Sequence, residues 1–167
     1  MKYALILDKN PPQIYTRGMN FKKKAVVFIA TGFFIGKIPF APGTFGSIPG
    51  LLLAFMMSCL DFSLAAFFMA FFIPAAIWIS GKAESILKAK DPGQIVIDEM
   101  AGMGVALMGL PFNLQTAVWG FFLFRFFDIL KPFPIKRIER KLPGGAGIVM
   151  DDVLAGLFAN TILRIVF

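Results

Sequence analysis

Six apolar runs, separated by short turns, account for most of the chain beyond residue 24. Their limits are residues 25–38, 46–60, 62–80, 95–110, 114–130 and 148–167. The runs lack the strict apolar–polar alternation of a half-buried strand, and turn-forming clusters such as Asp91-Pro92-Gly93 separate them. Most are no longer than the roughly 17–25 residues of a membrane-spanning helix. The pattern therefore predicts an all-α protein built from short helices.

The overall composition places these helices in a membrane. Apolar residues make up 57% of the sequence, phenylalanine occurs 21 times, and the mean hydropathy is +0.75. Soluble domains average roughly 45–50% apolar residues. An open sheet would leave unpaired backbone groups in lipid, so helices are the expected spanning elements. We expect a polytopic integral membrane helical bundle, in which the lone Cys59 packs within an apolar run and offers neither a disulfide nor a thiolate metal site.

The distribution of basic residues predicts how the chain crosses the membrane. Lysine and arginine are absent from residues 38–81 and 91–124, although the net charge is +7. Short basic loops mark the cytoplasmic side, so segments 82–90 and 131–141 are expected there. The second and third apolar runs then form one hairpin, the fourth and fifth form another, and the last run crosses alone. The first run, 25–38, has lysines at both ends, and we expect a re-entrant or interfacial helix there.

Residues 1–18 differ from the rest of the chain. Their apolar stretch, Ala4–Leu7, is shorter than the roughly 7–15-residue core of a signal peptide, and Pro11-Pro12 interrupts any helix. We expect residues 1–18 to be a loosely ordered extension and residues 19–167 to form a single membrane-embedded domain. The basic flanks suit anionic lipid headgroups. Because they border apolar spans and form no soluble groove, we do not expect nucleic acid as a partner.

Five of the ten carboxylates lie inside or at the edge of the apolar runs. They are Asp98, Glu99, Asp128, Asp151 and Asp152. An ionised side chain in hydrocarbon costs about 2.5–3.5 kcal/mol on insertion scales, so such residues persist mainly where they are paired, metal-bound or functional. The topology inferred from the basic residues alone places all five near the cytoplasmic surface. Carboxylates without histidine or thiolate favour a hard cation such as Mg²⁺, although acids in a first helical turn can also simply oppose the helix dipole.

Two basic residues accompany these acids. Arg125 and Asp128 share one helical face, where they form either a private ion pair or a metal ligand beside a guanidinium that clamps a phosphate oxygen. Lys131 is either a second phosphate contact or a residue whose amine reaches the membrane surface. The residues themselves leave both alternatives open.

Two glycine-containing segments, Pro42–Ser47 and Gly144–Gly147, precede predicted helices. Glycine lets backbone N–H groups approach an anion closely, and a helix N-terminus adds a favourable field. Thr44, Ser47 and Gly145 are therefore candidates for substrate binding. Thr44 and Ser47 can equally be an N-cap pair.

The residue inventory narrows the chemistry. The sequence has no histidine, which excludes phosphohistidine enzymes and histidine-dependent lipid phosphatases. No serine stands beside a usual base, and the DxDx(T/V) motif of aspartate nucleophiles is missing. What remains is Mg²⁺ held by carboxylates, which polarises a phosphoryl oxygen and activates water.

Four motifs together resemble the phosphatidylglycerophosphatase A family. They are GTFGS (43–47), IVIDEMAGM (95–103), FRFFDILKPFPI (124–135) and GGAGIVMDDVLAG (144–156), and the likeness runs from about residue 21 to the C-terminus. These proteins are Mg²⁺-dependent bacterial membrane enzymes that remove the terminal phosphate of phosphatidylglycerophosphate to give phosphatidylglycerol. The resemblance implies a catalytic domain at the cytoplasmic face of the inner membrane, with the five acids as its metal and catalytic site. It also implies that Arg125 and Lys131 lie near the phosphate.

Two mechanisms and one rival function follow. Direct attack by water is the expected route, with a covalent aspartyl-phosphate as the alternative. The rival function is a cation transporter or channel subunit, whose acids would bind the translocated ion. A CDP-alcohol phosphotransferase is also acidic and membrane-bound, but its long motif, which begins Asp-Gly, is absent.

Overall fold

The computed structural model describes residues 19–167, and within that range the chain forms seven α-helices, one 3₁₀ turn and no strand. The elements are α1 (Phe21–Ala30), η1 (Ile35–Lys37), α2 (Pro42–Ser58), α3 (Phe62–Leu87), α4 (Ile97–Leu107), α5 (Leu114–Leu130), α6 (Ile135–Lys141) and α7 (Gly145–Val166). The all-α prediction is therefore confirmed. The predicted extension, residues 1–18, lies outside the described residues.

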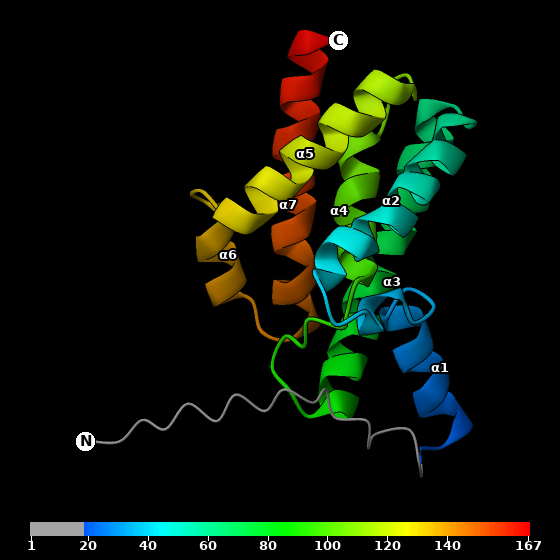
Figure 1. Cartoon of the computed structure of the whole chain (residues 1–167), viewed down its shortest axis with the longest axis vertical. Coiled ribbons are helices and arrows are strands. Elements are labelled where there is room, and N and C mark those ends of the chain that lie inside the picture. The colour runs from blue at the N-terminus through cyan, green and yellow to red at the C-terminus, as the bar shows by residue number, and fades with distance from the viewer. Residues whose placement is uncertain (1–18) are drawn as a thin grey trace.

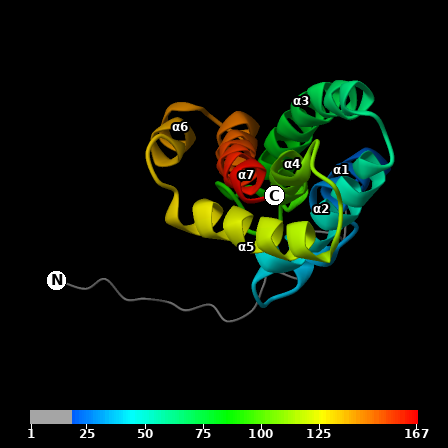
Figure 2. The ribbon, with the colours of Figure 1, turned by 90° about the horizontal axis from the view of Figure 1, so that it is seen from above.

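Helix α4 lies at the centre of the bundle. It packs against α7, α2, α3 and α5, and the view from above shows these four helices around it (Figures 1 and 2). Most of its residues are buried, and the main apolar core joins Met103 and Leu107 of α4 to Phe124 of α5 and Leu163 of α7. The short α6 packs on α7 at the side of the bundle. The first turn of α4 is thus enclosed by several helices.

The backbones of α4 and α7 are in direct contact. A methyl group on Gly156 would collide with the carbonyl oxygen of Gly102, and one on Gly102 would meet the carbonyl oxygen of Asp152 and the ring of Phe124. Small residues permit this close approach of two helices. The contact brings Asp152 of α7 beside the first turn of α4.

At the C-terminal end of α4, side chains of α7 donate hydrogen bonds to the last backbone carbonyls. Asn160 Nδ2 donates to the carbonyls of Ala106 and Met108, each at 3.0 Å. Arg164 Nη2 donates to the same Met108 carbonyl at 3.0 Å, and its Nε donates to Asn160 Oδ1 at 2.8 Å. The last carbonyls of a helix have no partner within it, so these bonds allow α4 to end in an apolar surrounding.

The exposed apolar surface of the helices is typical of a membrane protein. Helices α3 and α7 are long and apolar enough to cross a bilayer, and α2 is a shorter apolar helix. Only 17% of the most apolar window of α3 is buried, and its outward side chains include Phe67, Phe71 and Trp78. Contiguous exposed apolar surface on this scale indicates contact with lipid.

Several helices begin or end at residues other than those predicted from the sequence. The GTFGS segment lies inside α2, because Pro42 takes the first helical position, which suits proline. Helix α3 continues beyond its apolar stretch to Leu87, and the strongly basic α6 has no counterpart among the apolar runs. The first run is not one helix, because Gly32, Phe33 and Phe34 have positive φ values that end α1. Its relation to the membrane stays a prediction.

Candidate active site

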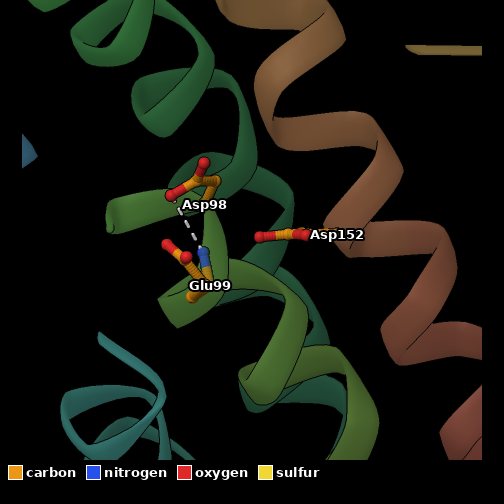
Figure 3. A group of neighbouring side chains, drawn as sticks. All are labelled: Asp98, Glu99 and Asp152. Carbon is orange, nitrogen blue, oxygen red and sulfur yellow. Dashed lines mark hydrogen bonds between the residues drawn. The ribbon is translucent and has the colours of Figure 1, made fainter. Parts of the chain in front are cut away.

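Three carboxylates meet where α4 and α7 touch. Asp98 and Glu99 come from the first turn of α4 and Asp152 from α7, and Figure 3 shows Asp152 pointing towards the other two. One oxygen from each lies within 4.8 Å of the others. Asp98 is 7% exposed and Asp152 is 4% exposed. The three side chains form an acidic cluster in which Asp98 and Asp152 are buried and Glu99 is partly buried.

Local structure explains only part of this cluster. Acids in the first turn of α4 face the positive end of the helix dipole, and Asp98 Oδ1 accepts the N–H of Glu99 at 3.1 Å. Helix α7 begins at Gly145 and has no acid in its first turn. The dipole therefore does not account for Asp152. Because Asp152 is buried and lies beyond the first turn of α7, its negative charge needs a stabilising partner other than the helix dipole.

The acidic cluster fits a divalent cation. Its donors are all carboxylate oxygens, which hard cations prefer. Within residues 19–167 no lysine or arginine nitrogen lies within 4.0 Å of its oxygens, and Glu99 Oε2 is buried without a hydrogen-bond partner. Three neighbouring buried carboxylates cannot all remain ionised without a compensating positive charge. A bound divalent cation would supply that charge.

The other two predicted acids are paired with the two predicted basic residues. Arg125 Nη1 donates to Asp128 Oδ2 at 2.5 Å, within α5. Lys131 Nζ, at the C-terminal end of α5, donates to Asp151 Oδ2 on α7 at 2.5 Å. All five acids and Lys131 line one cavity of about 160 Å³. The structure thus gathers the predicted acids in one place and divides them into three unpaired carboxylates and two ion pairs.

Asp91 also lines this cavity, and the sequence analysis did not identify it. It lies in the loop before α4, where Asp91-Pro92-Gly93 was interpreted only as a turn. Its backbone has a φ of 45°, and its N–H donates to Glu84 Oε1 at 3.2 Å. Partial burial raises the pKa of Asp91, although the nearby Lys131 acts against this shift. A non-glycine residue in this strained backbone region is a further signal of a functional position.

The glycine-containing segments contribute differently from the prediction. Ser47 is fully buried and its Oγ donates to the Gly43 carbonyl at 2.8 Å, while Thr44 lies half-buried in the first turn of α2. Gly43 is the residue at the site, because a methyl group there would lie 2.5 Å from Glu99 Oε1 and 2.9 Å from Arg125 Nη1. Gly145 packs against α3 and does not line the acidic cavity.

The fold and the donor set define a class: a helical membrane protein with a buried acidic site that can hold a divalent cation, bordered by two basic side chains. Comparison with known proteins then gives the family. Residues 28–167 match the sequence description of phosphatidylglycerophosphatase A, and the chain belongs to this family. It is therefore a phosphoric monoester hydrolase, as the resemblance of its motifs predicted.

Individual relatives agree with this assignment. The chain is 40% identical over 133 residues to phosphatidylglycerophosphatase A of Haemophilus influenzae, which covers 78% of this chain and 82% of the relative. Identity to the Escherichia coli protein of the same name is 35% over 136 residues, or 81% and 79% of the two chains. A Bacteroides thetaiotaomicron protein, provisionally named a phosphatidylinositol-3-phosphatase, is 38% identical over 148 residues, or 83% and 91%. No solved structure matches the chain.

Proposed function

We propose that the protein hydrolyses the terminal phosphate of phosphatidylglycerophosphate in a Mg²⁺-dependent reaction that yields phosphatidylglycerol and phosphate. Residues 19–167 form its single membrane-embedded catalytic domain. The observation that carries the proposal is the buried acidic cluster of Asp98, Glu99 and Asp152 beside two basic side chains. Membership of an enzyme family favours this function over the cation-transporter alternative.

Each group of residues has a role in this proposal. Asp98, Glu99 and Asp152 hold Mg²⁺, which when bound neutralises phosphoryl oxygens and lowers the pKa of water. Asp151 holds Lys131 in place at the cavity, and Asp128 holds Arg125 beside it, near Gly43 and Glu99. The acids thus serve two purposes, and only three of them are free to bind the metal.

Arg125 and Lys131 retain donors for a phosphate. A guanidinium has five N–H groups, and Arg125 Nε is buried without a partner while Nη1 binds Asp128. An ammonium has three N–H groups, and Lys131 uses its amine for Asp151 and Glu139. Both side chains can therefore donate to a phosphomonoester in the cavity and stabilise the negative charge that develops on its oxygens.

The distribution of charge supports a cytoplasmic orientation of the site in the bacterial inner membrane. Basic α6 and the lysines at the end of α3 lie at the same end of the molecule as the start of α7 (Figure 1). Basic segments favour the cytoplasmic side and its anionic lipids. A lipid substrate then keeps its acyl chains in the bilayer while its phosphate enters the cavity.

The decisive experiment measures phosphate release from short-chain phosphatidylglycerophosphate by the purified protein, with and without Mg²⁺. Asp98→Asn and Asp152→Asn are expected to abolish release and also the rise in melting temperature that Mg²⁺ causes in the wild type. Asp61→Asn is the matched control, because Asp61 caps α3 at the opposite end and asparagine caps equally well. Release without added metal in the presence of a chelator would contradict the proposal.

The same assay tests the chemical route and the substrate. Recovery of a phosphorylated aspartate from quenched turnover would replace direct attack by water with a covalent route. The similarity to the Bacteroides protein makes phosphatidylinositol 3-phosphate the informative second substrate. Faster release from the inositol lipid than from phosphatidylglycerophosphate would change the assigned substrate and leave the metal site unaffected.

A further inference from the structure

A second, larger cavity adjoins the acidic one. Its volume is about 650 Å³, and it lies between the loop before α4, helix α6 and the start of α7. Asp91, Ile148 and Asp151 line both cavities, so the two share a wall. A ligand beside the acidic cluster therefore lies next to the larger cavity.

Four basic side chains line the larger cavity without forming an ion pair. Its basic lining residues are Lys90, Lys136, Arg140 and Lys141. Within residues 19–167 none of these four lies within 4.0 Å of a carboxylate oxygen. The cavity also has four acidic lining residues: Glu139 and Asp151 share Lys131, and Glu84 accepts the backbone N–H of Asp91. The unpaired basic side chains are thus available to an anion.

The backbone at the start of α7 adds to this charge. Gly144 and Gly147 line the larger cavity, and the first turn of α7 has no side-chain cap. Gly144 has φ 57° and ψ −143°, which is accessible only to glycine, and a methyl group on Gly147 would meet the carbonyls of Leu142 and Glu139. Uncapped N–H groups at a helix N-terminus favour anions, and here they border the same cavity as Lys136 and Arg140.

We propose that this larger cavity binds the phosphodiester of the lipid headgroup and so selects substrates that carry two phosphates. The inference rests on the proposed function and specifies its substrate. In phosphatidylglycerophosphate one glycerol separates the terminal phosphomonoester from the phosphodiester. With the phosphomonoester beside the acidic cluster, the phosphodiester reaches Lys136 and Arg140. Phosphatidic acid has a phosphomonoester but no phosphodiester, so it cannot use the larger cavity.

The test compares these two lipids in mixed micelles of constant anionic content. For the Lys136→Gln/Arg140→Gln variant, we expect kcat/KM for short-chain phosphatidylglycerophosphate to fall roughly tenfold or more, through KM, and that for phosphatidic acid to stay within about twofold. Lys22→Gln/Lys82→Gln is the matched control, since both lysines are exposed and line neither cavity. Lys136 and Arg140 are exposed, so the fold should be retained, and thermal unfolding checks this. Equal losses on both lipids, or none on either, would overturn the proposal.

A binding measurement separates this proposal from the proposed function. Glycerophosphoglycerol carries the phosphodiester alone, and titration calorimetry should detect its binding to the wild type and to Asp98→Asn, with affinity weakened in Lys136→Gln/Arg140→Gln. A wild type that hydrolyses neither lipid but binds this diester through Lys136 and Arg140 would contradict the phosphatase function and support the cavity's specificity. Equal binding by the wild type and the double variant would contradict the cavity's role, whatever the activity.

Discussion

Lys131 Nζ, at the end of α5, lies 2.5 Å from Asp151 Oδ2 on α7, and it also lies 3.2 Å from Glu139 Oε1 on α6. One amine thereby links three helices around the acidic cavity. Burial lowers the pKa of Lys131, but the hydrogen bonds to Asp151 and Glu139 outweigh burial and raise it above its ordinary value of 10.5. The stability that its positive charge contributes is therefore present at neutral pH and is lost as the pH rises above that ordinary value.

Removal of this amine should destabilise the protein. In Lys131→Met, Asp151 is 6% exposed and loses its counter-charge. Breaking a buried pair costs about 3–5 kcal/mol, and we expect less here, about 1–3 kcal/mol, because Lys131 is 24% exposed. Thermal unfolding in detergent should show Tm lowered by roughly 3–10 °C. Arg137→Met, on the exposed surface of α6, should leave Tm nearly unchanged.

The double variant Lys131→Met/Asp151→Asn separates structure from substrate binding. Neutralising both partners should recover much of the lost stability, because no unpaired buried charge remains. Phosphate release should stay low, since the variant lacks the amine that we propose contacts the substrate phosphate. Wild-type activity in the double variant would show that Lys131 serves only the fold.

Gly43→Ala should lower activity without lowering stability. The added methyl group would lie 2.5 Å from Glu99 Oε1 and 2.9 Å from Arg125 Nη1, so both side chains must move. Misplacement of reacting groups by about 1 Å can cost roughly 100-fold in rate, whereas alanine favours a helix over glycine by about 0.5–1 kcal/mol. Gly104→Ala is the control, because its methyl group meets only the flexible ends of Met57 and Met69. An unchanged kcat/KM for Gly43→Ala would show that the start of α2 does not position the site.

Gly156→Ala should weaken metal binding from a distance. Its methyl group would meet the carbonyl of Gly102 and push α7 away from α4, which carries Asp152 away from Asp98 and Glu99. We expect the Mg²⁺ concentration at half-maximal activity to rise roughly tenfold or more. The rise in Tm on addition of Mg²⁺ should shrink in parallel. If Gly156→Ala binds Mg²⁺ as tightly as Gly104→Ala, the helix contact does not set the distance between the acids.

Asn160→Leu should destabilise the bundle while leaving the acidic cavity intact. The substitution leaves the carbonyl of Ala106 without its side-chain donor and removes one of two donors to Met108. An unsatisfied buried polar group costs about 1–3 kcal/mol, which thermal unfolding would detect. Thr161→Val is the matched control, since Thr161 Oγ1 bonds only within its own helix, to Leu157. Equal Tm values for the two variants would contradict a structural role for Asn160.

The helical class and the acidic cavity were predictable because both depend on local signals. Acids in apolar segments are costly, so Asp98, Asp128 and Asp152 were identifiable without any structure. The basic residues predicted which ends of the apolar segments face the cytoplasm, and this topology placed the acids at the same side of the membrane. Sequence reasoning therefore located five of the six acids that line the acidic cavity, but not their division between unpaired carboxylates and ion pairs.

That division depends on contacts between distant parts of the chain. Lys131 and Asp151 are 20 residues apart, and only the packing of α5 on α7 brings them together. Asp91 was missed because an acid in a polar turn costs nothing and gives no signal. Gly43 was not identified, because the candidates in this segment, Thr44 and Ser47, were chosen for their polar side chains. Gly43 matters because it has no side chain, which leaves room for Glu99 and Arg125. Contacts of the backbone are visible only in three dimensions.

The brevity of α4 has a consequence for the membrane itself. Its 11 residues extend about 16 Å, roughly half of a hydrocarbon core of about 30 Å. In the proposed orientation, α4 therefore extends from the acidic cavity through only part of the bilayer, whereas α3 and α7 are long enough to cross it. The apolar core around Met103, Leu107 and Phe124 lies beyond the acidic cavity along α4. In the proposed orientation, this core is the barrier that prevents protons and ions from crossing the bilayer next to the phosphate site.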